Sequence, residues 1–170
     1  MEFPNAQIHL LDIPSIDDVN FEPLENNYRK VLLFSNMIFF GIFLTGSIVA
    51  YFAADAWFVI FIPIAILLIA IISVSLINIS FKRKGLAVRQ KDIIYKSGLI
   101  FRKITTVPFN RIQHVEINQG PIEKRFDLSK LEIYTAGGAA SDLKIPGLKY
   151  ENAQKLRAFI IQKTRSDEEE

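Results

Sequence analysis

The chain has 170 residues, of which 50% are hydrophobic, and its formal net charge at pH 7 is +2. It contains no cysteine, which excludes disulfides, thiol catalysis and cysteine-ligated zinc. Most of the hydrophobic residues lie between residues 31 and 81, so the region that follows is large enough for one small domain.

Residues 1–28 are predicted to form an acidic N-terminal segment on the cytoplasmic side. This segment has six acidic residues and no Lys or Arg, a charge of −6. Residues 82–163 carry 17 Lys or Arg and 7 Asp or Glu, a charge of +10, and residues 164–170 form an acidic tail. If the first segment and the basic region emerge on the same side of a membrane, their opposite charges should hold them together, and the segment should partly mask the basic surface.

Two apolar runs, residues 31–52 and 56–79, predict a transmembrane hairpin over residues 29–81. The runs have 22 and 24 residues, and helices of that length reach roughly 33–36 Å, enough to cross a bilayer core. Only residues 53–55 separate the runs, so the chain should turn and return. Basic residues flank the hairpin at both of its ends, whereas the turn carries only Asp55. The positive-inside rule therefore places both termini in the cytoplasm.

Small residues within the runs are candidates for helix packing, because small side chains let membrane helices approach closely. The candidates are Gly41, Gly46 and Ala50 in the first run and Ala65 and Ala70 in the second. Two interpretations remain open: the two helices pack against each other through these residues, or the residues contact another membrane protein. Asn36 and Asn78 are expected at a similar depth, where they could share a hydrogen bond. Neither run has an ionisable residue, which argues against an ion or proton pathway.

After the hairpin, the pattern changes to short strands followed by one helix. Strands are expected over residues 85–91, 93–95, 100–109, 111–118, 130–135 and 142–145, with turns at 90–92 and 96–98 and one helical turn allowed within 120–128. The last strand should end at residues 146–147. Residues 151–163 are amphipathic, with Ala153, Leu156 and Ile160 on one face. This order predicts a small α+β domain, a bent antiparallel sheet or partly open barrel capped by the C-terminal helix.

Several short motifs lie within residues 108–148. The most specific are Pro108, Arg111-Ile112-Gln113, Gln119-Gly120, Arg125, Thr135-Ala136-Gly137-Gly138 and Pro146-Gly147-Leu148. Together with the hairpin before them and the helix after them, these motifs resemble the bacterial PH-like domain of the YdbS-type membrane proteins. The resemblance covers nearly the whole chain. It implies a pleckstrin-homology-like domain over residues 82–163, a place in the bacterial cell membrane and no established enzyme activity.

Three residues in this stretch carry further expectations. Asp127 stands where the family is expected to have Gly. Because Asp adopts left-handed backbone more readily than most residues, the fold should be kept. Arg111 and Arg125 belong to the family-like motifs and are expected to form structural ion pairs or hydrogen bonds.

No constellation in the sequence predicts catalysis, a metal site or a cofactor site. The two histidines, His9 and His114, lie over 100 positions apart, and no nucleophile elbow, phosphate loop or metal-binding spacing occurs. The Gly137-Gly138 pair is expected to form a turn. A membrane hairpin without a recognition motif argues against a nucleic-acid-binding protein.

The remaining functional signal is a set of basic residues that begins where the second run ends. The candidates for contacts with anionic lipid headgroups or partner proteins are Lys82, Arg83, Lys84, Arg89, Lys91, Lys96, Arg102 and Lys103. The first three lie at the membrane boundary, where setting the topology is the favoured explanation. The others either form one positive face or belong to an ordinary solvated surface. The short turn at residues 90–92 argues against specific phosphoinositide binding.

The sequence therefore predicts a non-enzymatic, membrane-anchored PH-like module. It would bind partner proteins, including another protein with a PH-like domain, or anionic headgroups at the cytoplasmic face. The alternative is an accessory subunit of a membrane transport or export complex that acts through the hairpin itself.

Overall fold

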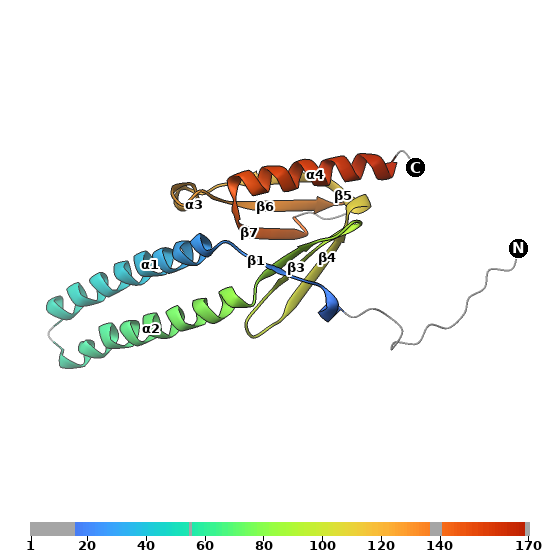
Figure 1. The fold of residues 1–170 in the computed structure, drawn as a ribbon. Helices are drawn as coiled ribbons and strands as arrows, with labels where there is room; N and C mark the ends of the chain where they lie inside the picture. The colour runs from blue at the N-terminus through green and yellow to red at the C-terminus, as the bar shows by residue number, and fades with distance from the viewer. Residues whose placement is uncertain (1–15, 55, 137–140, 169–170) are drawn as a thin grey trace, which may run out of the picture.

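A computed structural model of the chain describes residues 16–54, 56–136 and 141–168. Two long helices lie side by side, and a domain of strands and one long helix joins them at one end (Figure 1). The helices are α1 (Asn26–Ala53) and α2 (Phe61–Lys82), and a 3₁₀ turn over Trp57–Ile60 precedes α2. Both segments are long and apolar enough to cross a membrane. The predicted turn at Asp55 lies outside the described residues.

A hydrogen bond joins the two helices, but between other residues than the sequence indicated. The Ser73 hydroxyl donates to Asn36 Oδ1 at 2.9 Å, whereas the Oδ1 atom of Asn78 is buried without a hydrogen-bond partner among the described residues. In an antiparallel helix pair, residues at equal distances from the two ends that adjoin the domain lie at the same depth. Asn36 lies ten residues after the start of α1 and Ser73 nine residues before the end of α2, so these two meet. Asn78, only four residues before that end, lies too close to the domain.

The domain contains two antiparallel sheets that are not closed into a barrel. The strands of the first sheet, in spatial order, are β1 (Glu22–Pro23), β2 (Gly85–Val88), β3 (Asp92–Ser97) and β4 (Lys103–Pro108). Those of the second are β5 (Ile112–Asn118), β6 (Leu128–Thr135) and β7 (Leu143–Lys149). The 3₁₀ turn η4 (Phe109–Arg111) connects the sheets, α3 (Pro121–Arg125) links β5 to β6, and α4 (Tyr150–Glu168) follows β7. The predicted α+β architecture with a C-terminal helix is confirmed.

The core brings together both sheets and α4. Ile93 and Phe109 come from the first sheet and the turn after it, while Leu131 and Ile133 come from β6, on the face that the alternation predicted. Ile160 enters from α4 and is fully buried, as the amphipathic pattern indicated. Burying large aliphatic and aromatic side chains on all these elements stabilises their arrangement as one unit.

The first strand of the domain comes from the residues that precede α1 in the chain. Glu22 and Pro23 pair with Leu86 and Gly85 of β2, and Leu24 is buried in the core. A two-residue strand that contains proline shows no alternation, so no periodic pattern predicts it. The predicted segment boundaries at residues 28, 81 and 163 stay predictions, although the structure ties the end of the first segment into the sheet.

Two strand predictions near glycines and turns require correction. The last strand does not end at Pro146 and Gly147 but continues through them to Lys149. The register between β6 and β7 shifts between Ser129 and Leu131, and this irregularity accommodates the proline and glycine. The strand expected from residue 100 begins at Lys103, because residues 98–102 form the turn.

Asp127 has a φ of 54°, so the expected left-handed backbone at this position is confirmed. The side chains of Arg111 and Arg125, in contrast, make no ion pair or hydrogen bond with any residue that the structure describes. Both side chains are exposed. For the part of the chain that the structure describes, the prediction that Arg111 and Arg125 form structural ion pairs or hydrogen bonds is therefore wrong. Gly137-Gly138 lies outside the described part.

Candidate anion-binding site

Five of the eight predicted basic contact residues line one pocket at the end of α2, with a volume of about 360 Å³. The lining residues are Lys82, Arg83, Lys96, Ser97, Gly98, Arg102, Lys103 and Ile104. None of the five cations forms an ion pair with a carboxylate in the described ranges. We call this group of residues the basic pocket.

Three elements build the basic pocket. Lys82 ends α2 and Arg83 caps it, while Lys96 lies near the end of β3 and Lys103 begins β4. In the β3–β4 ladder, Ser97 lies opposite Lys103. Lys96, the residue before Ser97, therefore lies at the same end of the strand pair as Lys103. The pocket therefore combines the end of a long apolar helix with the tip of a strand pair.

The turn that closes this hairpin requires a glycine. Gly98 has a φ of 102°, a backbone conformation that residues with a side chain rarely adopt. An added Cβ would also lie 1.8 Å from the carbonyl oxygen of Phe101. Arg83 Nη1 donates a hydrogen bond to the carbonyl oxygen of Leu99 at 2.8 Å. This bond holds the turn against the end of α2 and fixes one wall of the pocket to the other.

The N-terminal segment reaches the edge of the same pocket. The Nζ atom of Lys96 lies 4.0 Å from the centre of the Phe21 ring, a cation–π contact just before β1. This contact concerns only the described end of the segment, so the expected masking of the basic surface by residues 1–28 stays a prediction.

The other three predicted residues lie elsewhere. Lys84 packs against Tyr28, with its Nζ atom 5.0 Å from the ring centre, and burial lowers its pKa. Arg89 forms an ion pair with Asp92 in the β2–β3 turn, which also contains Lys91. Successive turns of an antiparallel sheet lie at opposite ends of the strands, so Lys91 lies at the other end of β3 from the basic pocket. A binding role for any of these residues stays a prediction.

Sequence reasoning missed the neutral part of the pocket wall, Ser97, Gly98 and Ile104. The turn signal at residues 96–98 was recognised, but nothing in the sequence showed that this turn lies against α2. The pocket offers positive charge and one hydroxyl but no carboxylate or imidazole. Positive charge and a hydroxyl donor are groups that attract an anion.

A second charged cluster lies on the outer face of the second sheet. Glu132 is nearly buried there, with its carboxylate 2.7 Å from Lys130 Nζ and 3.5 Å from Lys144 Nζ. The hydrogen bond from Lys130, together with the charges of both lysines, holds the pKa of Glu132 at about 2. The ring of His114 stacks on that of Tyr134 at 4.2 Å on the same face. The Lys144–Glu132 contact joins β7 to β6, and the His114–Tyr134 contact joins β5 to β6.

Replacing Glu132 with Gln should destabilise the domain at neutral pH by on the order of 1–2 kcal/mol. The lowered pKa means that the carboxylate contributes its full stability above its ordinary value of 4.5 and loses it as the pH falls toward 2. The difference between wild type and Glu132→Gln should therefore shrink across that range. Urea unfolding at several pH values measures it, with the exposed Glu116→Gln as control. A difference that stays constant with pH would contradict the assignment.

The packing residues predicted in the hairpin do not meet as a group. An apolar groove of about 460 Å³ between α1 and α2 includes Gly41 and Ala70 in its lining, but not Gly46, Ala50 or Ala65. A Cβ added at Gly41 or Gly46 would meet nothing within 4 Å, so neither glycine permits a close approach between α1 and α2. Contact of these residues with another membrane protein stays a prediction.

Comparison with known proteins extends over most of the chain. Residues 35–164 match the family described as bacterial PH domain. The UPF0699 transmembrane protein YdbS of Bacillus subtilis (strain 168) is 36% identical over 78 residues, which cover 46% of this chain and 47% of that protein. The matched stretch thus spans about half the length of that relative. No solved structure matches the chain.

Proposed function

The chain belongs to the bacterial PH domain family, and on this premise we propose that it is a non-enzymatic, membrane-anchored module that holds anionic lipid headgroups in its basic pocket. The observation that carries this proposal is the group of five cations around one pocket beside the end of α2, none of which has a carboxylate partner among the described residues. The pocket volume falls within the range of about 300–1,000 Å³ that small-ligand sites occupy.

The position of the pocket supports a lipid as its ligand. Lys82 and Arg83 follow directly on an apolar helix long enough to span a bilayer, so the pocket begins where the hydrocarbon core ends. The basic flanks at both ends of the hairpin support, by the positive-inside rule, a cytoplasmic location of the termini and the domain in a bacterial cell. Anionic headgroups of the inner leaflet attract basic residues at that depth.

Removing two of these charges tests the proposal. The double variant Arg102→Gln/Lys103→Gln should bind phosphatidylglycerol about 10- to 30-fold more weakly, because each cation near an anionic headgroup contributes about 1 kcal/mol. Protein in neutral detergent is titrated with phosphatidylglycerol, and bound lipid is counted by native mass spectrometry. Phosphatidylcholine and inorganic phosphate serve as comparison ligands. Added salt should weaken binding of the anionic lipid to the wild type.

The matched control removes two charges from the exposed face of α4, as Lys155→Gln/Arg157→Gln, and should bind like the wild type. Equal losses in both double variants would show attraction to overall charge instead of a site. Phosphate competing as well as phosphatidylglycerol would identify a free anion as the ligand.

A second candidate function rests on the groove between α1 and α2. The groove is apolar and open in this chain, and Gly41 leaves room in it. An accessory subunit of a transport or export complex would bind another membrane protein there, including one with a PH-like domain. Normal lipid binding by Arg102→Gln/Lys103→Gln would contradict the headgroup site and favour this candidate.

A further inference from the structure

The tip of the β3–β4 hairpin carries two apolar side chains that nothing in the described chain covers. Ile100 is 82% exposed and Phe101 is 88% exposed. Outside the helical hairpin, no other large apolar side chain of the described residues is more than half exposed. A single exposed apolar residue needs no explanation, but two adjacent ones on a turn held by a glycine and a hydrogen bond form a defined apolar tip.

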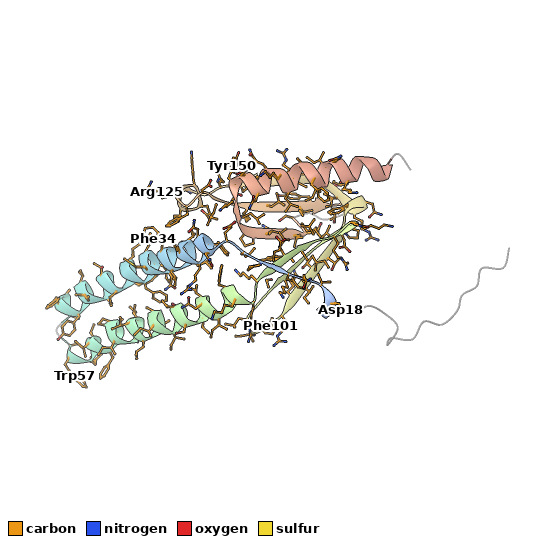
Figure 2. The ribbon with its side chains drawn as sticks, in the orientation of Figure 1. Asp18, Phe34, Trp57, Phe101, Arg125 and Tyr150 are labelled. Carbon is orange, nitrogen blue, oxygen red and sulfur yellow. The ribbon has the colours of Figure 1, made fainter. Side chains whose placement is uncertain are left out.

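This tip lies at the level of the last turn of α2. Arg83, which caps α2, donates its hydrogen bond to the carbonyl oxygen of Leu99, the residue before the tip. Figure 1 shows the β3–β4 turn beside the end of α2, and Figure 2 labels Phe101 there. Because the long apolar stretch of α2 gives way to Lys82 at the end of the helix, this level is that of the boundary between hydrocarbon and headgroups.

A contact between the domain and α1, on the other side of the helix pair, determines which side of the domain faces the membrane. Phe126, which follows α3, packs on Phe34 of α1 with ring centres 6.4 Å apart. Phe34 belongs to the candidate span, so α3 also lies close to the membrane boundary. Figure 2 shows Phe34 and Arg125 near each other on the α1 side, away from Phe101. The domain therefore turns α3 and the β3–β4 tip toward the same bilayer surface.

We propose that Ile100 and Phe101 insert into the leaflet on which the domain lies. The residues that follow, Arg102 and Lys103, fit this position, because cationic side chains remain at the headgroups while adjacent apolar side chains enter the acyl region. The tip gives the domain a lipid contact of its own, separate from α1 and α2. The occupant is lipid, not a protein partner, because the anchored helices hold this tip at the lipid surface in every copy of the chain.

The sequence permits a direct test by tryptophan fluorescence. Its single tryptophan, Trp57, is first replaced as Trp57→Phe, and Phe101→Trp is then introduced at the tip. The matched control is Gln90→Trp, in the exposed turn at the opposite end of β3. β3 has six residues, so the two turns lie about 20 Å apart. Both variants are placed in phosphatidylcholine bilayers with and without bromine on the acyl chains, since bromine quenches nearby tryptophan.

The Phe101→Trp variant should have blue-shifted emission and lose most of it in brominated lipid, whereas Gln90→Trp should lose little. Equal quenching of the two variants would overturn the insertion. A blue shift without quenching would also overturn it, because it would mean burial against protein. The bilayer contains no anionic lipid, so this test is independent of whether the basic pocket binds headgroups.

Discussion

Replacing Phe109 with Ala should lower the free energy of unfolding of the domain by about 3–5 kcal/mol. Phe109 is fully buried in the turn between the two sheets, and its ring meets that of Phe159 edge to face at 5.8 Å. Its backbone N–H also donates to the carbonyl oxygen of Lys91 at 3.0 Å. The truncation leaves a cavity where the first sheet, the second sheet and α4 meet, so all three should loosen together.

Urea unfolding followed by near-ultraviolet circular dichroism, in detergent, measures this loss. Gln90→Ala is the control, because its side chain is exposed in the turn between β2 and β3. Its stability should stay within about 0.5 kcal/mol of the wild type. Similar losses in both variants would show that the junction at Phe109 is not the centre of the core.

The second large effect is expected from Gly147→Ala. Gly147 has a φ of 72°, and an added Cβ would lie 2.4 Å from Cγ of Tyr28, in the first turns of α1. The left-handed backbone alone costs a residue with a side chain roughly 1–2 kcal/mol, and the Tyr28 ring must move as well. The hydrogen bond from Glu25 N–H to the Gly147 carbonyl, 3.3 Å long, should then break.

Hydrogen exchange measures this change at residues 22–31 and in β7. Exchange should rise at the junction of α1 with the domain, and thermal stability should fall. Gly46→Ala is the control, because its Cβ meets nothing within 4 Å and alanine favours a helix. An unchanged exchange pattern in Gly147→Ala would contradict a role of this glycine in seating α1 on the domain.

Sequence patterns predicted the helices and strands that show a periodic arrangement of apolar residues within one continuous segment. The two spans, the alternation of Leu131 and Ile133 in β6, and the inner face of α4 were all visible as local periodicity. The strand β1 was not, because it has two residues and is held only by its pairing with β2, more than 60 residues later in the chain. Its existence depends on tertiary contact, which one sequence does not encode locally.

The candidate site, too, could be predicted only in part from the sequence. Residue type identified the basic residues, but their grouping depended on which turn lies beside α2. Lys96, Arg102 and Lys103 lie at that turn, whereas Arg89 and Lys91 lie at the opposite end of the strands. The exposure of Ile100 and Phe101 was missed altogether, because a run of apolar residues near a turn predicts a buried strand until the turn is located.

The pairing of β1 with β2 has a mechanical consequence. Pro23 lies opposite Gly85, three residues before α1 begins and three residues after α2 ends. The strand that leads into the bilayer and the strand that leaves it are thus about 5 Å apart and joined as neighbours in one ladder. A domain attached by one strand can swivel, but one attached by two cannot. A change in bilayer thickness that tilts the two helices must therefore rotate the sheet by the same angle.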